Sequence, residues 1–276
     1  MSEGSIQILS DLHLAHPGSR VTEVAQLRPL IEGAKTVLFN GDAFELRKKA
    51  LVPRALESRS ELEALCAELG AEPVFMTGNH DPQITEHHYF DLCGGDVFLT
   101  HGDILYDDVS PWSKLIVDMH RVLDEIRDEY PPDYLDDLDL RLKAAKRIAA
   151  ETKIRAACKP GTLAKVKTIA MEMWPPKRPL AILKAWRESH QLAHGIRDQF
   201  RPEARFIIIG HTHRAGINEA GGKVSINTGA FLPMAKSLTV RIASGRLTAR
   251  DIVESSGSFR AGRERGAWDV GASVSE

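Results

Sequence analysis

Short apolar runs alternate with stretches of helical periodicity over the first hundred residues. The runs have the length of strands and end at polar or glycine-containing turns, which predicts strands at 6–9, 36–39, 73–76 and 97–99. Between them, residues 24–31 and 57–69 place apolar side chains every three to four positions, which predicts helices. This alternation favours an α/β fold, in which ligands bind where loops leave the carboxyl ends of buried parallel strands.

A different pattern occupies residues 110–201, where helical periodicity replaces the strand signals. It predicts helices over 112–128, 138–157, 162–173 and 180–199. Strand patterns return at 206–209, 224–227, 238–241 and 247–250. We therefore expect a single domain over 1–253 with a helical insertion, acting as a lid, at about 110–201. The small, polar and charged residues of 254–276 predict a flexible C-terminal tail.

Composition and charge narrow the class of protein. The 276 residues include 36 Lys and Arg against 38 Asp and Glu, so the chain has no polycationic character of the kind that binds nucleic acid. Three cysteines without CxxC spacing argue against a disulfide framework and a thiolate zinc site. The N-terminus has no signal-peptide pattern and no long apolar run suggests a membrane span, so we expect a cytoplasmic protein.

Chemistry-bearing side chains follow five of the predicted strands. The seven candidate ligands are Asp11, His13, Asp42, Asn79, His101, His211 and His213. Any one such residue is commonplace in a turn, but five strand ends together predict one shared site. Oxygen and imidazole ligands without thiolates suit Mn²⁺, Fe²⁺ or Zn²⁺. Seven groups are too many for one tetrahedral ion, whereas two ions about 3.5–4 Å apart would use them all and would suit phosphoryl displacement.

The blocks SDLHL, NGD, TGNHD, THGD and GHTHR resemble, in order and residue type, the signature blocks of the calcineurin-like metallophosphoesterases. The resemblance implies an α/β/β/α sandwich of two mixed sheets and a phosphoesterase that uses a metal-bound hydroxide. It implies a first divalent metal, Mn²⁺ above all, on Asp11, His13, Asp42 and His213. A second metal is implied on Asp42, Asn79, His101 and His211, with Asp42 as the bridge. His80 is implied to stabilise the transition state or protonate the leaving oxygen, oriented by Asp81.

Two further segments are similar to the UDP-2,3-diacylglucosamine pyrophosphatases of lipid A biosynthesis. They are HGDILYDDV, residues 101–109, and DAFE, residues 42–45. The resemblance implies hydrolysis of a diphosphate in a nucleotide-linked lipid to UMP and a lipid phosphate. Substrate contacts are expected from Asn79, His80 and Arg214, the last through its planar guanidinium. This chain differs from that group at His80, where arginine is frequent, and in the basic continuation Leu46-Arg47-Lys48-Lys49.

Two alternative functions remain open from the sequence: a phosphatase or phosphodiesterase acting on nucleotides or phosphoproteins, and a non-catalytic scaffold that binds proteins. The basic second half of the insertion, thirteen bases over residues 141–187 against two acids, either is solvated or contacts anionic groups at the inner face of a membrane. Nucleic acid is the less favoured partner, because this stretch lacks interleaved aromatic residues.

Overall fold

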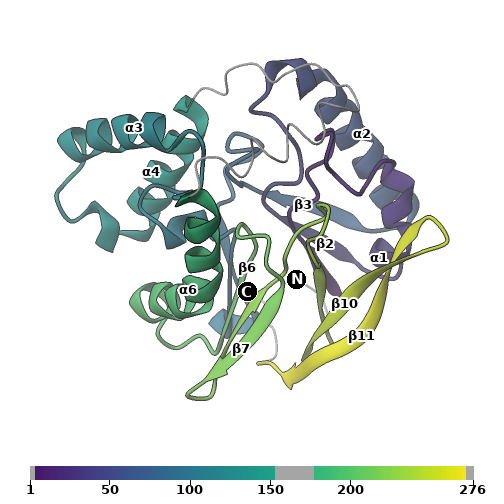
Figure 1. Cartoon of the computed structure of the whole chain (residues 1–276). Helices are drawn as coiled ribbons and strands as arrows, with labels where there is room; N and C mark the ends of the chain where they lie inside the picture. Colours follow the sequence, from purple (N-terminus) through teal and green to yellow (C-terminus); the bar gives the residue numbers. More distant parts are fainter. Residues whose placement is uncertain (1–3, 153–176, 272–276) are drawn as a thin grey trace.

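Two mixed β-sheets face each other, with helices on both outer sides (Figure 1). The computed structural model describes residues 4–152 and 177–271. The first sheet has the order β11-β10-β9-β1-β2-β3. Its strands are β1 (Ile6–Leu9), β2 (Thr36–Asn40), β3 (Glu72–Met76), β9 (Leu238–Ala243), β10 (Arg246–Ser255) and β11 (Ser258–Asp269). This arrangement confirms the expected α/β/β/α sandwich.

The second sheet has the order β4-β5-β6-β8-β7. Its strands are β4 (Tyr89–Leu92), β5 (Val97–Thr100), β6 (Phe206–Ile209), β7 (Gly216–Ala220) and β8 (Lys223–Asn227). Strands β5, β6 and β8 are parallel, and β4 and β7 pair antiparallel at the two edges. In the first sheet β1, β2 and β3 are parallel while β9 is antiparallel to β1. The carboxyl ends of β1, β2, β3, β5 and β6 therefore lead into the predicted site.

The central strands, such as β1 and β6, bury side chains on both faces, which explains their continuous apolar runs. Ile8 of β1 and Ile208 of β6 belong to the core between the two sheets. Leu9 packs instead with the helices over the first sheet, and Ile207 with the helices over the second. Because side chains alternate along a strand, each run contributes to two layers of core.

Helices pack on the outer faces of the two sheets. The helices of the described residues are η1 (Val24–Leu27), α1 (Arg28–Ile31), η2 (Lys49–Leu51), α2 (Val52–Glu68), η3 (Cys93–Gly95), η4 (Asp103–Leu105), α3 (Ile116–Glu129), η5 (Tyr134–Asp136), α4 (Leu138–Glu151) and α6 (Lys177–Phe200), where η marks a short 3₁₀ helix. Helices α1 and α2 lie beside the first sheet, and α3, α4 and α6 lie on the side of the second (Figure 1).

The helical insertion packs on the second sheet through an apolar core shared with β6. Helices α3, α4 and α6 match three of the four expected helices, and the fourth, at 162–173, lies outside the described residues. The role of the insertion as a lid stays a prediction. No helix within residues 4–152 and 177–271 is long and apolar enough to cross a membrane.

Residues 254–271 differ from the flexible tail expected there. Strand β11 pairs with β10 along most of its length and forms the edge of the first sheet. Phe259 is fully buried, and the ring of Trp268 lies 5.9 Å from that of Phe206. The Arg205 guanidinium donates to the Asp96 carboxylate and to the Asp269 carbonyl, which ties the end of β11 to the second sheet. These few apolar anchors hold a segment of polar composition in place.

Candidate metal centre

Five loops at the carboxyl ends of the parallel strands bring the predicted ligands together. Asp11 and His13 follow β1, Asp42 follows β2, Asn79 follows β3, His101 follows β5, and His211 and His213 follow β6. Five of these residues have a positive φ between 49° and 65°: Asp11, His13, Asp42, His211 and His213. Left-handed backbone is costly for residues with a Cβ and concentrates at functional sites, which fits a site built by these loops.

Glycines beside the ligands allow the loops to pack this closely. A Cβ on Gly78 would lie 2.2 Å from Oδ1 of Asp42, and one on Gly210 would lie 2.2 Å from Oδ2 of Asp11. Both distances are far inside van der Waals contact. The glycines of TGNHD and GHTHR are therefore required by the packing of the two carboxylates.

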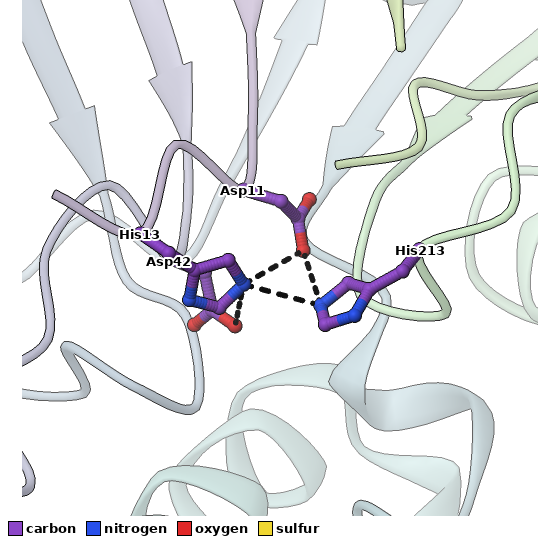
Figure 2. A group of neighbouring side chains, drawn as sticks. All are labelled: Asp11, His13, Asp42 and His213. Carbon is purple, nitrogen blue, oxygen red and sulfur yellow. Dashed lines mark hydrogen bonds and ion pairs between the residues drawn. The ribbon is translucent and has the colours of Figure 1, made fainter. Parts of the chain in front are cut away.

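The first cluster consists of Asp11, His13, Asp42 and His213, whose ligand atoms all lie within 4.8 Å of one another (Figure 2). Nε2 of His213 lies 3.2 Å from Oδ1 of Asp11 and 3.2 Å from Nε2 of His13. Nε2 of His13 lies 3.9 Å from Oδ2 of Asp42. Two carboxylates and two imidazoles thus converge on one point, as the ligands of a divalent cation do.

The second cluster joins Asp42 to Asn79, His101 and His211. Nε2 of His101 lies 3.5 Å from Oδ1 of Asp42 and 3.3 Å from Oδ1 of Asn79. Nδ1 of His211 lies 2.7 Å from the same Asn79 oxygen. Asp42 therefore directs one carboxylate oxygen toward each cluster.

Backbone carbonyls fix the orientation of the two histidines in the second cluster. Nδ1 of His101 lies 2.9 Å from the Asn40 carbonyl, and Nε2 of His211 lies 2.8 Å from the Val109 carbonyl. If each of these nitrogens donates its proton outward, the other ring nitrogen presents a lone pair to the site. A hydrogen bond of this kind on the outer ring nitrogen is typical of metal-ligating histidine.

The charges of the site are those of a cation-binding centre. Burial lowers the pKa of His101, but the carboxylates of Asp42, Asp11 and Asp103 outweigh it and raise that pKa to about 10. Burial and the neighbouring charge of His101 lower the pKa of His211 to about 4. The buried carboxylates therefore create a strong demand for positive charge at this edge of the sheets.

Asp42 provides the test of whether the residues fit two divalent ions. The side chain is only 1% exposed, and its buried Oδ2 atom has no hydrogen-bond partner among the described residues. An unsatisfied buried carboxylate oxygen is costly, and a coordinated cation satisfies it. With two clusters of nitrogen and oxygen ligands sharing this carboxylate, the site fits two divalent metals.

His80 is oriented by Glu45, which the sequence analysis did not assign. Nδ1 of His80 lies 3.0 Å from Oε2 of the fully buried Glu45. Burial lowers the pKa of His80, but the charge of Asp42 and the hydrogen bond to Glu45 outweigh it, so the pKa lies above its ordinary value. Glu45 stands three residues after Asp42 in the segment DAFE. This position close to a ligand is the only feature of the sequence that could have indicated its role.

The expectation that Asp81 orients His80 does not match the structure. Asp81 accepts the backbone N–H groups of Asp42, Phe44 and Gly78 at 2.8 to 3.1 Å. It is fully buried, and burial together with the charge of Asp42 raises its pKa to about 6. Asp81 therefore fixes the loops that follow β2 and β3, and the carboxylate that meets the His80 ring is that of Glu45.

A cavity of about 650 Å³ opens over the two clusters and the His80 side chain. Arg214, the predicted phosphate contact, is exposed beside it, with its guanidinium carbon 5.2 Å from the centre of the Trp186 ring. Trp186 itself lines the cavity and donates its Nε1–H to the Thr212 carbonyl at 2.8 Å. The structure thus places Arg214 near the rim of the cavity, and its contact with substrate stays a prediction.

Comparisons with known proteins describe what the chain is similar to. No protein-family profile and no curated protein sequence matches it. Among solved structures, a single mutant of Vps29 from Entamoeba histolytica is 14% identical over 95% of this chain and 99% of its own, with a TM-score of 0.44. A dimetal phosphatase of Danio rerio is 14% identical over 90% and 96%, with a TM-score of 0.42. A predicted phosphoesterase of Streptococcus pneumoniae is 14% identical over 96% and 99%, with a TM-score of 0.36. Similarity at this level assigns no activity to the chain.

Proposed function

We propose that the chain is a metallophosphoesterase of the calcineurin-like kind, which hydrolyses a phosphodiester or diphosphate bond with two divalent metals. The observation that carries the proposal is Asp42, shared by two ligand clusters and left with an unpartnered buried oxygen in the described part of the chain. A bound pair of divalent ions supplies charge neutralisation at the phosphoryl oxygens and an activated water. The residues of the first metal are Asp11, His13, Asp42 and His213, and those of the second are Asp42, Asn79, His101 and His211.

His80 and Glu45 supply the protein's own contribution to the reaction. The His80 ring lines the cavity, and its Nδ1 lies against the Glu45 carboxylate. That carboxylate stabilises the protonated imidazole, because opposite charge at hydrogen-bond distance favours the charged form. With Nδ1 engaged by Glu45, Nε2 is the atom that donates a hydrogen bond to the phosphoryl group or a proton to the leaving oxygen.

The substrate we propose is UDP-2,3-diacylglucosamine or a related nucleotide-linked lipid. The cavity combines the two ligand clusters with an apolar wall formed by Trp112, Leu115, Met119, Ile182, Trp186 and Leu232. Such a wall suits an acyl or other apolar group attached to the scissile phosphate. Peripheral contact with an anionic membrane surface through the basic insertion belongs to this proposal.

Hydrolysis by the Mn²⁺-loaded protein tests the proposal. The substrates are bis-p-nitrophenyl phosphate, p-nitrophenyl phosphate and UDP-2,3-diacylglucosamine, with products identified by mass spectrometry. Release of UMP from the lipid supports the full proposal. Activity on bis-p-nitrophenyl phosphate alone supports the phosphoesterase activity and rejects the lipid as the substrate. A nucleotide or phosphoprotein substrate is then the next candidate. No hydrolysis, with no bound metal, rejects the proposal and favours the scaffold alternative.

A further inference from the structure

The cavity over the two ligand clusters is lined by positive charge that does not belong to the candidate metal ligands. Arg47 and Lys48 line it, and no acidic residue is among the described residues of its lining. The carboxylates of Asp11 and Asp42 lie with the metal ligands. Two bound divalent metals would offset these carboxylates, so the cations of the wall would leave the cavity positive.

Arg47 has a buried hydrogen-bond donor with no partner in the described part of the chain. Its Nη2 donates to the Thr152 carbonyl at 3.2 Å, just after the end of α4. Its Nε is buried and has no acceptor, and no acidic side chain of residues 4–152 or 177–271 lies within ion-pair distance of the guanidinium. Leaving this buried donor of a partly buried guanidinium unsatisfied is unfavourable for folding, which indicates a role other than stability.

Lys48 adds a second positive charge next to Arg47. Its Nζ lies 3.7 Å from Oε2 of Glu45, the same oxygen that lies 3.0 Å from Nδ1 of His80. One carboxylate thus faces both Lys48 and the His80 ring. The single charge of Glu45 cannot neutralise Arg47 as well, so this part of the wall keeps a net positive charge.

We propose that Arg47, with Lys48 beside it, forms an anion subsite that binds a second phosphoryl group of the substrate next to the scissile one. This inference rests on the proposed function and narrows it to substrates with a diphosphate. An arginine fork is suited to a phosphoryl group because its parallel N–H donors match the phosphoryl oxygens. The carbonyl of Thr152 holds one end of the guanidinium, so fewer conformations are lost when the anion binds.

Two matched pairs of probes test the subsite. Binding of thymidine monophosphate and thymidine diphosphate to the Mn²⁺-loaded protein is measured by equilibrium dialysis. Hydrolysis is measured on the p-nitrophenyl esters of the same two nucleotides, which also differ by one phosphoryl group. The variants are Arg47→Met, Arg47→Lys and, as the control, Arg121→Met. Arg121 is an exposed residue of α3 paired with Glu125, and it does not line the cavity. Chelation of free Mn²⁺ by the diphosphate is equal for all variants, so comparison with the wild type isolates Arg47.

The wild type is expected to bind thymidine diphosphate about tenfold more tightly than the monophosphate. A difference of this size corresponds to one additional charge-assisted contact. Arg47→Met should remove most of this preference, by raising the dissociation constant of the diphosphate and the KM of its ester. Its affinity for the monophosphate should stay within about twofold of the wild type. Arg47→Lys keeps part of the preference, and Arg121→Met keeps all of it. Thermal unfolding midpoints establish that each variant is folded.

An unchanged preference in Arg47→Met, or an equal loss for both nucleotides, overturns the subsite. If the wild type hydrolyses neither ester, the proposed phosphoesterase activity fails, and the binding comparison still decides the role of Arg47.

Discussion

At the scale of single residues, the centre depends on groups that are held in costly conformations. Asp42 combines a φ of 52°, full burial and an oxygen without a partner among the described residues. Positive φ at a non-glycine residue costs on the order of 1 kcal/mol or more. The fold sustains this cost because the neighbouring carboxylate of Asp81 accepts the Asp42 N–H and fixes the turn.

Glu45 and Asp81 are expected to fail in different ways when they are replaced. Glu45→Gln removes the charge that stabilises the His80 imidazolium, so kcat on bis-p-nitrophenyl phosphate should fall about tenfold or more while bound metal is unchanged.

Asp81→Ala leaves three buried N–H groups without an acceptor and should lower the free energy of unfolding by about 2 to 3 kcal/mol. Steady-state kinetics, metal analysis and urea unfolding separate the two effects. Unchanged kcat in Glu45→Gln would contradict the role given to that carboxylate.

At the scale of elements, a buried lysine joins the insertion to two of the ligand loops. Nζ of Lys146, on α4, donates to Oδ2 of Asp103 at 2.6 Å and to the Thr77 carbonyl at 3.0 Å. Thr77 precedes the Asn79 loop, and Asp103 follows the His101 loop. Lys146 is 7% exposed and Asp103 is fully buried, so this pair is shielded from water and salt.

Removing one partner of that pair should be strongly destabilising. Lys146→Met leaves the Asp103 carboxylate buried without its counter-charge and should lower the free energy of unfolding by about 3 kcal/mol. The exposed neighbour Lys143 on the same helix provides the control, and Lys143→Met should change stability by less than about 0.5 kcal/mol. Urea unfolding followed by circular dichroism measures both variants. Equal stability of the two variants would show that the pair does not hold α4 in place.

The link between the second sheet and strand β11 should depend on pH. Burial raises the pKa of Asp96, but the hydrogen bonds from Arg205 and the Gly271 N–H outweigh it, and the pKa lies below its ordinary value of 3.8. A lowered folded-state pKa stabilises the fold above the unfolded value, and this contribution is lost as the pH falls through the folded value. Asp96→Asn should therefore lower the free energy of unfolding by about 1 to 2 kcal/mol at pH 7, and by progressively less below about pH 4. The exposed Asp124→Asn is the control, and a pH-independent loss in Asp96→Asn would contradict the assignment.

At the scale of the whole molecule, the buried parallel strands and the ligands at their carboxyl ends were the features best predicted from the sequence. Continuous apolar runs such as Phe206–Ile209 mark strands covered on both faces, and the ligands follow directly at their carboxyl ends. Strand β11 escaped prediction because it lies at a sheet edge with several exposed arginines and only a few buried anchors such as Phe259. Its place is fixed by contacts with Asp96 and Arg205, which are distant in sequence.

The roles of individual polar residues were harder to predict than the positions of the ligands. Asp81 adjoins His80 in sequence, yet its carboxylate turns to backbone N–H groups, and Glu45 reaches the His80 ring from another loop. Which acid meets a histidine depends on the path of two loops, and periodicity carries no information about that path. The unsatisfied donor of Arg47 is likewise a property of packing alone.

The central claim, two divalent metals bridged by Asp42, is tested most directly by metal analysis of the purified protein after incubation with Mn²⁺ and removal of free ions. The wild type should retain about two equivalents, as should His80→Ala, whose turnover falls because only the proton-donating group is lost. Asp42→Ala should lose both metals and nearly all activity, because one carboxylate serves both clusters. Two equivalents retained in Asp42→Ala, or equal metal loss in the two variants, would contradict the account.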